Sequence, residues 1–168
     1  KLLTLGPRGY ALRGLARKLA RPENDSVLAV VEEVADLHHK LITATIPKLR
    51  SGELWSLSDQ NGELIARSSR ILEAFQAEII HSTFPERGAL RLLEIGCGSG
   101  VYLKHAADRN PSLTAIGIEL QPDVAEMARA NLRAWVLESR VKVETGDIRE
   151  KALDKPFDIA TLYNNIYY

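Results

Sequence analysis

The chain has 168 residues, of which 45% are hydrophobic and 26% are charged. These values are typical of a folded globular protein and exclude a disordered one, and the length suits one domain with an appendage. Lys plus Arg and Asp plus Glu number 22 each, so no overall charge attracts nucleic acid or an anionic membrane. No apolar run approaches the roughly 20 residues that cross a bilayer, so we expect no membrane partner.

Cys97 is the only cysteine, which excludes an internal disulfide and a zinc site built from cysteines. This usage fits a reducing compartment, and we expect the protein to be cytoplasmic. The first residue is Lys1 and the only methionine is Met127. We therefore expect the sequence to be a fragment of a longer protein.

The first part of the chain, residues 1–88, is predicted to be mostly helical. Residues 1–21 contain six basic and no acidic residues, with leucines at helical spacing, which predicts a short basic amphipathic helix. Such a helix can bind nucleic acid or a membrane surface, but a solvated surface helix is the more common case. An apolar stripe predicts a stronger helix over residues 25–45, ended by Pro47.

Two further features belong to this region. Asn61-Gly62 is typical of a hairpin turn but also fits the start of a helix, and we predict a helix over residues 63–81. His38 and His39 lack further metal ligands at matching spacing, so we interpret them as surface residues.

After Gly88 the sequence alternates between strand and helix patterns. We predict strands over 90–95, 113–120, 141–144 and 157–163, and helices over 100–109 and 122–137. This order is typical of an α/β fold with a parallel sheet and flanking helices. We therefore predict a Rossmann-like domain over residues 89–168, preceded by a helical region, 1–88, that caps the site or mediates oligomerisation.

The first predicted strand runs into a glycine-rich segment, Leu92 to Gly100, which reads LLEIGCGSG. Glycines between a strand and a helix let backbone N–H groups and the positive end of the helix approach a ligand closely. A Gly-x-Gly alone is weak evidence, because tight turns also use glycine. The neighbouring residues decide the ligand.

A dinucleotide fingerprint, Gly-x-Gly-x-x-Gly, requires its third glycine at position 101, which is Val101. This mismatch counts against NAD. Glu119 ends the second predicted strand, where a carboxylate can accept the hydroxyls of a ribose in either class of cofactor. Gly146-Asp147 follows the third strand, and a dehydrogenase has no standard use for that carboxylate.

With these motifs in this order, residues 91–167 resemble the class I S-adenosylmethionine-dependent methyltransferases, which have a Rossmann-like fold. The resemblance implies that S-adenosylmethionine is the cofactor and that the two acids and the glycine loop surround it. The cofactor-binding residues that it implies are Glu94, Gly96, Cys97, Gly98, Gly100, Glu119, Leu120, Gly146, Asp147 and Ile148. Taken singly, Glu119 also fits a solvated strand end and Asp147 an Asx turn.

The fourth strand leads to Asn164-Asn165-Ile166-Tyr167, where the family places methyl transfer. The resemblance makes Asn164, Asn165 and Tyr167 candidate catalytic residues beside the acceptor. Amino-methylating members carry Asn/Asp-Pro-Pro-Tyr here, and this chain lacks both prolines, so the methylated atom stays open. We expect no metal, a small-molecule acceptor, and nucleic acid as an unlikely partner.

The family sheet has further strands, whereas this chain stops after the fourth. We expect the piece to be truncated and to associate into a homo-oligomer through its N-terminal helices or the open sheet edge. The function predicted is that of a methyltransferase. The alternatives are a non-catalytic module that binds the cofactor or keeps only the fold, and, less favoured, an NAD(P)-dependent oxidoreductase.

Overall fold

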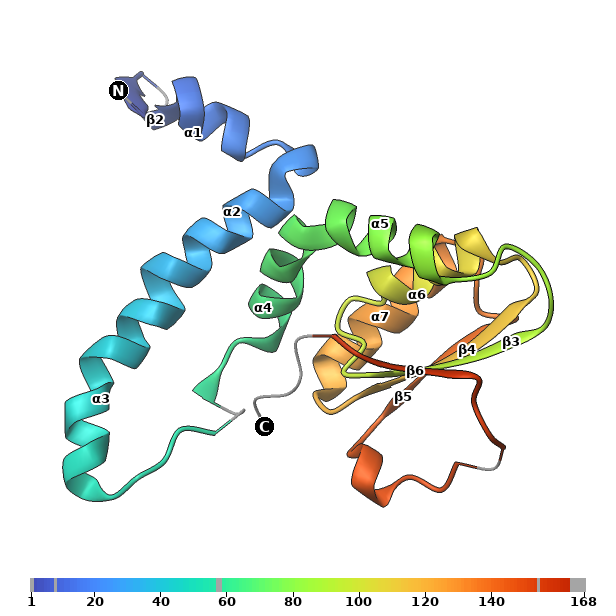
Figure 1. The fold of residues 1–168 in the computed structure, drawn as a ribbon. Coiled ribbons are helices and arrows are strands. Elements are labelled where there is room, and N and C mark those ends of the chain that lie inside the picture. The colour runs from blue at the N-terminus through green and yellow to red at the C-terminus, as the bar shows by residue number, and fades with distance from the viewer. Residues whose placement is uncertain (1, 8, 57–58, 154, 164–168) are drawn as a thin grey trace. The chain divides into compact units, whose positions relative to one another are not determined.

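The computed structural model describes residues 2–7, 9–56, 59–153 and 155–163 (Figure 1). The chain divides into two compact units, Lys1–Ile71 and Leu72–Tyr168. The units separate before the helix at Glu73–Thr83, because that helix packs against a helix of the sheet domain. The domain boundary near Gly88 stays a prediction.

The N-terminal unit begins with a hairpin that we did not predict. Strands β1 (Leu3–Gly6) and β2 (Gly9–Leu12) pair antiparallel, with Leu3 opposite Leu12. The helix predicted over residues 1–21 is limited to α1 (Gly14–Leu19), so the prediction for the hairpin residues was wrong. Gly9, at the turn between the two strands, has a φ of 100°, which glycine adopts more readily than other residues.

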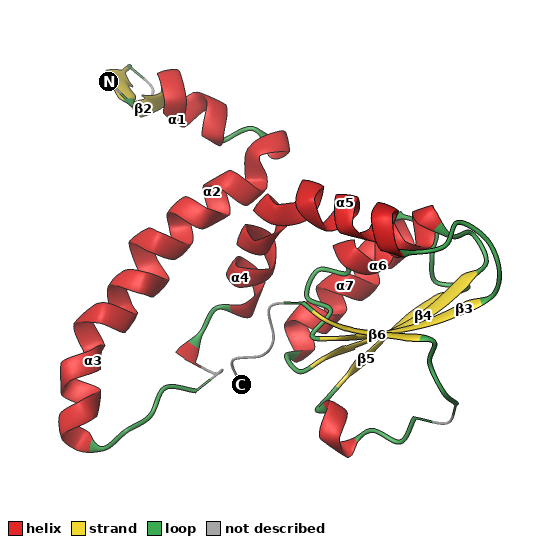
Figure 2. Ribbon diagram, in the orientation of Figure 1, coloured by secondary structure: helices red, strands yellow, loops and turns green. Residues whose placement is uncertain are grey.

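A run of helical segments follows the hairpin (Figure 2). It consists of η1 (Pro22–Asn24), α2 (Asp25–Glu32), the π-helical segment η2 (Glu33–His38) and α3 (His39–Ser51). The predicted helix is therefore present, but it continues through Pro47 instead of ending there. Its C-terminal signal is Gly52, which has the left-handed conformation common after helices.

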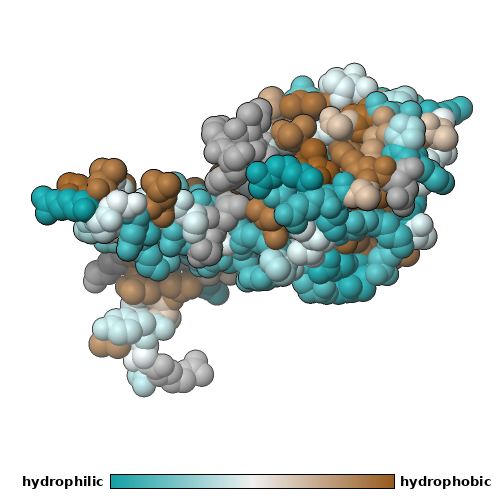
Figure 3. Space-filling model, turned by 90° about the horizontal axis from the view of Figure 1, so that it is seen from below, coloured by the Kyte–Doolittle hydropathy of each residue, from teal (hydrophilic) through white to brown (hydrophobic). Residues whose placement is uncertain are grey.

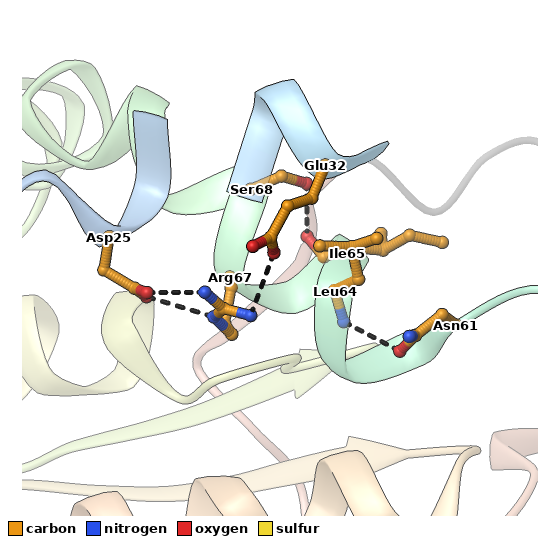
Figure 4. Close-up of polar contacts among 7 residues, drawn as sticks. All are labelled: Asp25, Glu32, Asn61, Leu64, Ile65, Arg67 and Ser68. Carbon is orange, nitrogen blue, oxygen red and sulfur yellow. Dashed lines mark hydrogen bonds and ion pairs between the residues drawn. The ribbon is translucent and has the colours of Figure 1, made fainter. Parts of the chain in front are cut away.

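Helix α4 (Gly62–Ser68) packs against α2. Oδ1 of Asn61 accepts the N–H of Leu64 at 3.0 Å, so Asn61-Gly62 starts a helix and does not form a hairpin turn. Arg67 joins the two helices, because Nη2 donates to Asp25 at 2.6 Å and Nη1 lies 3.5 Å from Glu32 (Figure 4). The 3₁₀ segment η4 (Ser69–Leu72) interrupts the single helix predicted over 63–81.

The C-terminal unit contains a parallel sheet of strand order β5-β4-β3-β6. Its strands are β3 (Leu90–Ile95), β4 (Leu113–Glu119), β5 (Val141–Thr145) and β6 (Ile159–Leu162). Strand β3 pairs with β4 on one side and with β6 on the other, so Leu93 lies opposite both Ile116 and Ala160. The predicted α/β fold with a Rossmann-like parallel sheet is confirmed.

The α-helices in the described part of this unit are α5 (Glu73–Thr83), α6 (Val101–Arg109) and α7 (Pro122–Ala134). Helices α6 and α7 pack on the strands, and α5 packs on α6. Side chains alternate along β5, where Val141 and Val143 are buried and Lys142 and Glu144 are exposed. Figure 3 shows apolar side chains at the surface of this part of the molecule, and Leu162 is 52% exposed.

Among the described residues, no helix is both long enough and apolar enough to cross a membrane.

Candidate cofactor site

The glycine-rich segment forms a tight turn between β3 and α6. Gly96, Gly98 and Gly100 have φ values of 69°, 52° and 78°, which a side chain would make unfavourable. The N–H groups of Gly96 and Cys97 both donate to the carbonyl of Ile118, at 2.7 and 3.1 Å. The loop is therefore fixed to the neighbouring strand β4.

The outer side of this loop is open. A Cβ atom built on Gly98 has no protein atom within 4 Å, so a ligand can approach the backbone at that residue. The inner side is crowded, because a Cβ on Gly117 of β4 would lie 2.8 Å from both Cβ and Sγ of Cys97. Cys97 thus fills the space that Gly117 leaves.

Cys97 does not have the properties of a reactive thiolate. Its side chain is buried, and burial raises the pKa of the thiol well above its ordinary value, with Glu94 and Glu119 acting in the same direction. A neutral thiol is a poor nucleophile. The contribution of Cys97 to the loop is its small size and its backbone.

Glu119 joins the end of β4 to the glycine loop. Oε2 accepts the N–H of Gly98 at 3.0 Å, and Oε1 accepts the N–H of Gln121 at 3.0 Å. Each carboxylate oxygen has capacity for a further hydrogen bond. Glu119 can therefore accept the hydroxyls of a ribose while its two backbone contacts hold it in place.

Glu94 is the least satisfied polar group of the described part of the chain. It is 2% exposed, and Oε2 has no hydrogen-bond partner among the described residues. Burial raises the pKa of this carboxyl well above its ordinary value, and the nearby Glu119 raises it further. A buried acceptor without a donor fits a ligand that supplies one, and the cationic methionine end of S-adenosylmethionine does so.

Gly146 and Asp147 lie at the end of β5. The N–H of Gly146 donates to the carbonyl of Glu119 at 2.8 Å, which places the two strand ends side by side. Asp147 accepts the N–H of Arg149 at 2.9 Å and so caps the 3₁₀ segment η5 (Ile148–Glu150). The Arg149 guanidinium also bonds this carboxylate and lowers the pKa of Asp147 to about 2. The side chain thus has the turn-forming role that we gave as the alternative.

The carboxyl ends of β3, β4 and β5 bring the predicted cofactor-binding residues to one edge of the sheet, as parallel strands require. Leu120 is 45% exposed there and Ile148 is half-buried. The candidate catalytic residues Asn164, Asn165 and Tyr167 lie outside the described residues. In the described part of the chain, no three His, Cys, Asp or Glu side chains are placed to hold a metal ion.

Two contacts of helices α6 and α7 beside the glycine loop were not predicted from the sequence. The ring of Tyr102, in the first turn of α6, stacks on Tyr163 just after β6, with 6.5 Å between ring centroids. Nδ2 of Asn131 in α7 donates to the carbonyl of Ser99 at 2.9 Å. The sequence did offer one signal for Asn131. It is a polar residue three positions after Ala128 and therefore lies beside the apolar stripe of the helix that faces the sheet.

Comparison with known proteins shows which proteins the C-terminal residues resemble. Residues 93–168 match the family described as a methyltransferase domain. A tRNA1(Val) (adenine(37)-N6)-methyltransferase of Porphyromonas gingivalis strain W83 is 33% identical over 84 residues, which cover 50% of this chain and 31% of the relative. The Yersinia pestis (strain Pestoides F) protein of the same name is 32% identical over 85 residues, which cover 50% and 34%. The chain thus spans about a third of the length of these relatives.

Solved structures share the fold. The mitomycin 7-O-methyltransferase MmcR has a TM-score of 0.70 at 23% identity, over 92% of this chain and 49% of that protein. The S-adenosylmethionine-dependent methyltransferase SibL has a TM-score of 0.54 at 19% identity, over 98% and 53%. At these identities the likeness concerns the fold alone.

The sheet, with its glycine loop and strand-end acids, has the Rossmann-like fold of the solved methyltransferases. Residues 93–168 are similar to the family described as a methyltransferase domain.

The comparisons correct one expectation. We expected nucleic acid to be an unlikely partner, and relatives named for methylation of tRNA contradict this. The expectation rested on the balanced net charge, which describes the whole sequence. Overall charge does not report on a local surface or on a single methylated base.

Proposed function

We propose that the protein transfers a methyl group from S-adenosylmethionine bound at the carboxyl edge of the sheet. The observation that carries this proposal is the buried Glu94 carboxylate, which lacks a partner for Oε2 and lies beside the open glycine loop and Glu119. A cationic ligand with donor groups satisfies this arrangement, whereas an apolar ligand does not.

The residues of the chain divide the work of holding the cofactor. Glu94 offers a hydrogen-bond acceptor to the methionine end, the glycine loop offers backbone N–H groups, and Glu119 accepts from the ribose. Gly146, Asp147 and Ile148 border the adenine. When bound, the cofactor supplies a methyl group already activated by its sulfonium, so the protein contributes mainly alignment and exclusion of water.

We propose a nitrogen of nucleic acid as the acceptor to test first. The curated relatives named for tRNA adenine methylation are 33% and 32% identical, which exceeds the identity to MmcR, at 23%. Residues 164–167, Asn-Asn-Ile-Tyr, also resemble the Asn-Pro-Pro-Tyr of amino-methylating enzymes, although both prolines are missing.

Calorimetric titration with S-adenosylhomocysteine and with NADH tests the cofactor. We expect S-adenosylhomocysteine to bind and NADH not to bind, and the reverse result overturns the proposal. Transfer of radiolabelled methyl groups to tRNA transcripts, compared with a panel of small aromatic alcohols and amines, tests the acceptor. Cofactor binding without transfer to either class of acceptor favours the non-catalytic module.

A further inference from the structure

The far side of the glycine loop rests on helix α7. The Ser99 carbonyl accepts a hydrogen bond from the Asn131 side chain at 2.9 Å, although the residues are 32 positions apart in sequence. A Cβ atom on Gly100 would lie 3.6 Å from Cβ of Ala128, one turn earlier in the same helix. The loop is thus in close contact with α7 at two successive residues.

The same helix also holds the acid of the site. Its N-terminal end begins at Gln121, whose N–H donates to Oε1 of Glu119 at 3.0 Å. Oε2 of that carboxylate accepts from Gly98 in the loop. Helix α7 therefore contacts both the Glu119 carboxylate and the glycine loop. Gln121, at its N-terminal end, holds the carboxylate, and Asn131, further along the helix, holds the loop.

We propose that Asn131 is a positioning residue for cofactor binding, acting through the Ser99 carbonyl. This inference rests on the proposed function. The bond to the Ser99 carbonyl holds the peptide plane between Ser99 and Gly100, the last peptide of the glycine loop before α6. A neutral donor is required, because a carboxylate at this position would repel the carbonyl oxygen.

The chain offers a matched control in Asn110, which follows α6. Nδ2 of Asn110 donates to the carbonyl of Gly88 at 3.1 Å, and Oδ1 accepts the N–H of Ser112 at 2.9 Å. Asn110 thus makes the same kind of side-chain bond to a distant carbonyl. It lies just before β4, at the opposite end of that strand from Glu119.

The test compares Asn131→Asp with Asn110→Asp, which are nearly isosteric and remove the same type of donor. Both are measured for thermal midpoint and for affinity toward S-adenosylhomocysteine. We expect both to lower the thermal midpoint, and Asn131→Asp alone to weaken binding, by about 10-fold. Asn131→Gln keeps the amide donor and is expected to retain more affinity than Asn131→Asp.

Equal affinities for wild type, Asn131→Asp and Asn110→Asp overturn the inference and leave Asn131 a purely structural residue. If Asn131→Asp does not fold, Asn131→Ala decides, because it removes the amide donor without adding a charge: affinity equal to that of the wild type overturns the inference. Failure of the proposed function is distinct, because the wild type itself then does not bind S-adenosylhomocysteine.

Discussion

The N–H of Gly98 donates to Oε2 of Glu119 across 3.0 Å, which joins the glycine loop of β3 to the acid at the end of β4. Two motifs that are 21 residues apart in sequence are therefore in direct contact.

Replacing Glu119 tests its role in holding the ribose. We expect Glu119→Ala to weaken binding of S-adenosylhomocysteine by about 1–3 kcal/mol, because the hydroxyls lose their acceptor and Gly98 loses its partner. Calorimetry measures the change. Glu144→Ala is the control, because Glu144 is exposed and bonds only Lys151 among the contacts that the structure describes. Unchanged affinity in Glu119→Ala would remove Glu119 from the site.

The raised pKa of Glu94 leads us to expect that the free energy of unfolding depends on pH. Burial raises the pKa of Glu94 in the folded protein, so the folded state binds more protons than the unfolded state. The free energy of unfolding therefore falls as the pH rises from the ordinary pKa of glutamate through the raised value. Glu94→Gln removes this contribution, and we expect the variant to lose less stability than the wild type over that range.

Thermal midpoints of both proteins between about pH 5 and 8 measure the difference. Carboxylates distant from Glu94 contribute equally to the two proteins, so only the difference is interpreted. Parallel pH profiles would contradict the assignment.

Gly117 is predicted to accept no side chain. A Cβ there would lie 2.8 Å from Cys97 and from Cδ1 of Leu103, both of which are buried. We expect Gly117→Ala to lower the free energy of unfolding by about 1–3 kcal/mol through overpacking. Gly6→Ala, whose added Cβ would have only a carbonyl oxygen at 3.8 Å, is the control and should change little. Equal effects in urea unfolding would refute this account.

The pair of Asp25 and Arg67 predicts a weaker pH effect in the N-terminal unit. Arg67 lowers the pKa of Asp25 through its side-chain hydrogen bond. The pair therefore stabilises the folded state at pH values above the ordinary pKa of aspartate. This stabilisation is lost as the pH falls through the lowered value. The side chains are 27% and 39% exposed, so a double-mutant cycle with Asp25→Asn and Arg67→Met should give about 0.2–1 kcal/mol near neutral pH. A coupling energy of zero would show that the contact is energetically neutral.

The sequence supports prediction best where local chemistry and fold coincide. Strand β3 and the turn after it were predictable because buried residues lead directly into glycines, and Pro122 marks the start of α7. The hairpin at residues 3–12 was missed because leucines at helical spacing outweighed the period of two in short strands. The prediction that the helix ends at Pro47 was wrong. Proline removes a single backbone N–H, and the helix continues past it to its C-cap at Gly52.

For the site, the acids and glycines were predictable because each ends a strand, and parallel strands end at one edge. Asn131 and Tyr102 were not, because their contacts with Ser99 and Tyr163 depend on how helices pack on the sheet. Spacing along the chain carries no information about such contacts. The turn formed by Asp147 is local and was foreseen as an alternative.

The capped turn at Asp147 also bears on the order in which the site assembles. Asp147 and Arg149 are two residues apart, so their contact closes a very short segment and needs no sheet. The contact between Gly98 and Glu119 closes a much longer segment and needs β3 and β4 to be paired. Loop closure is entropically cheaper for the shorter segment. The turn at Asp147 can thus form early in folding, whereas the glycine loop takes shape only with the sheet.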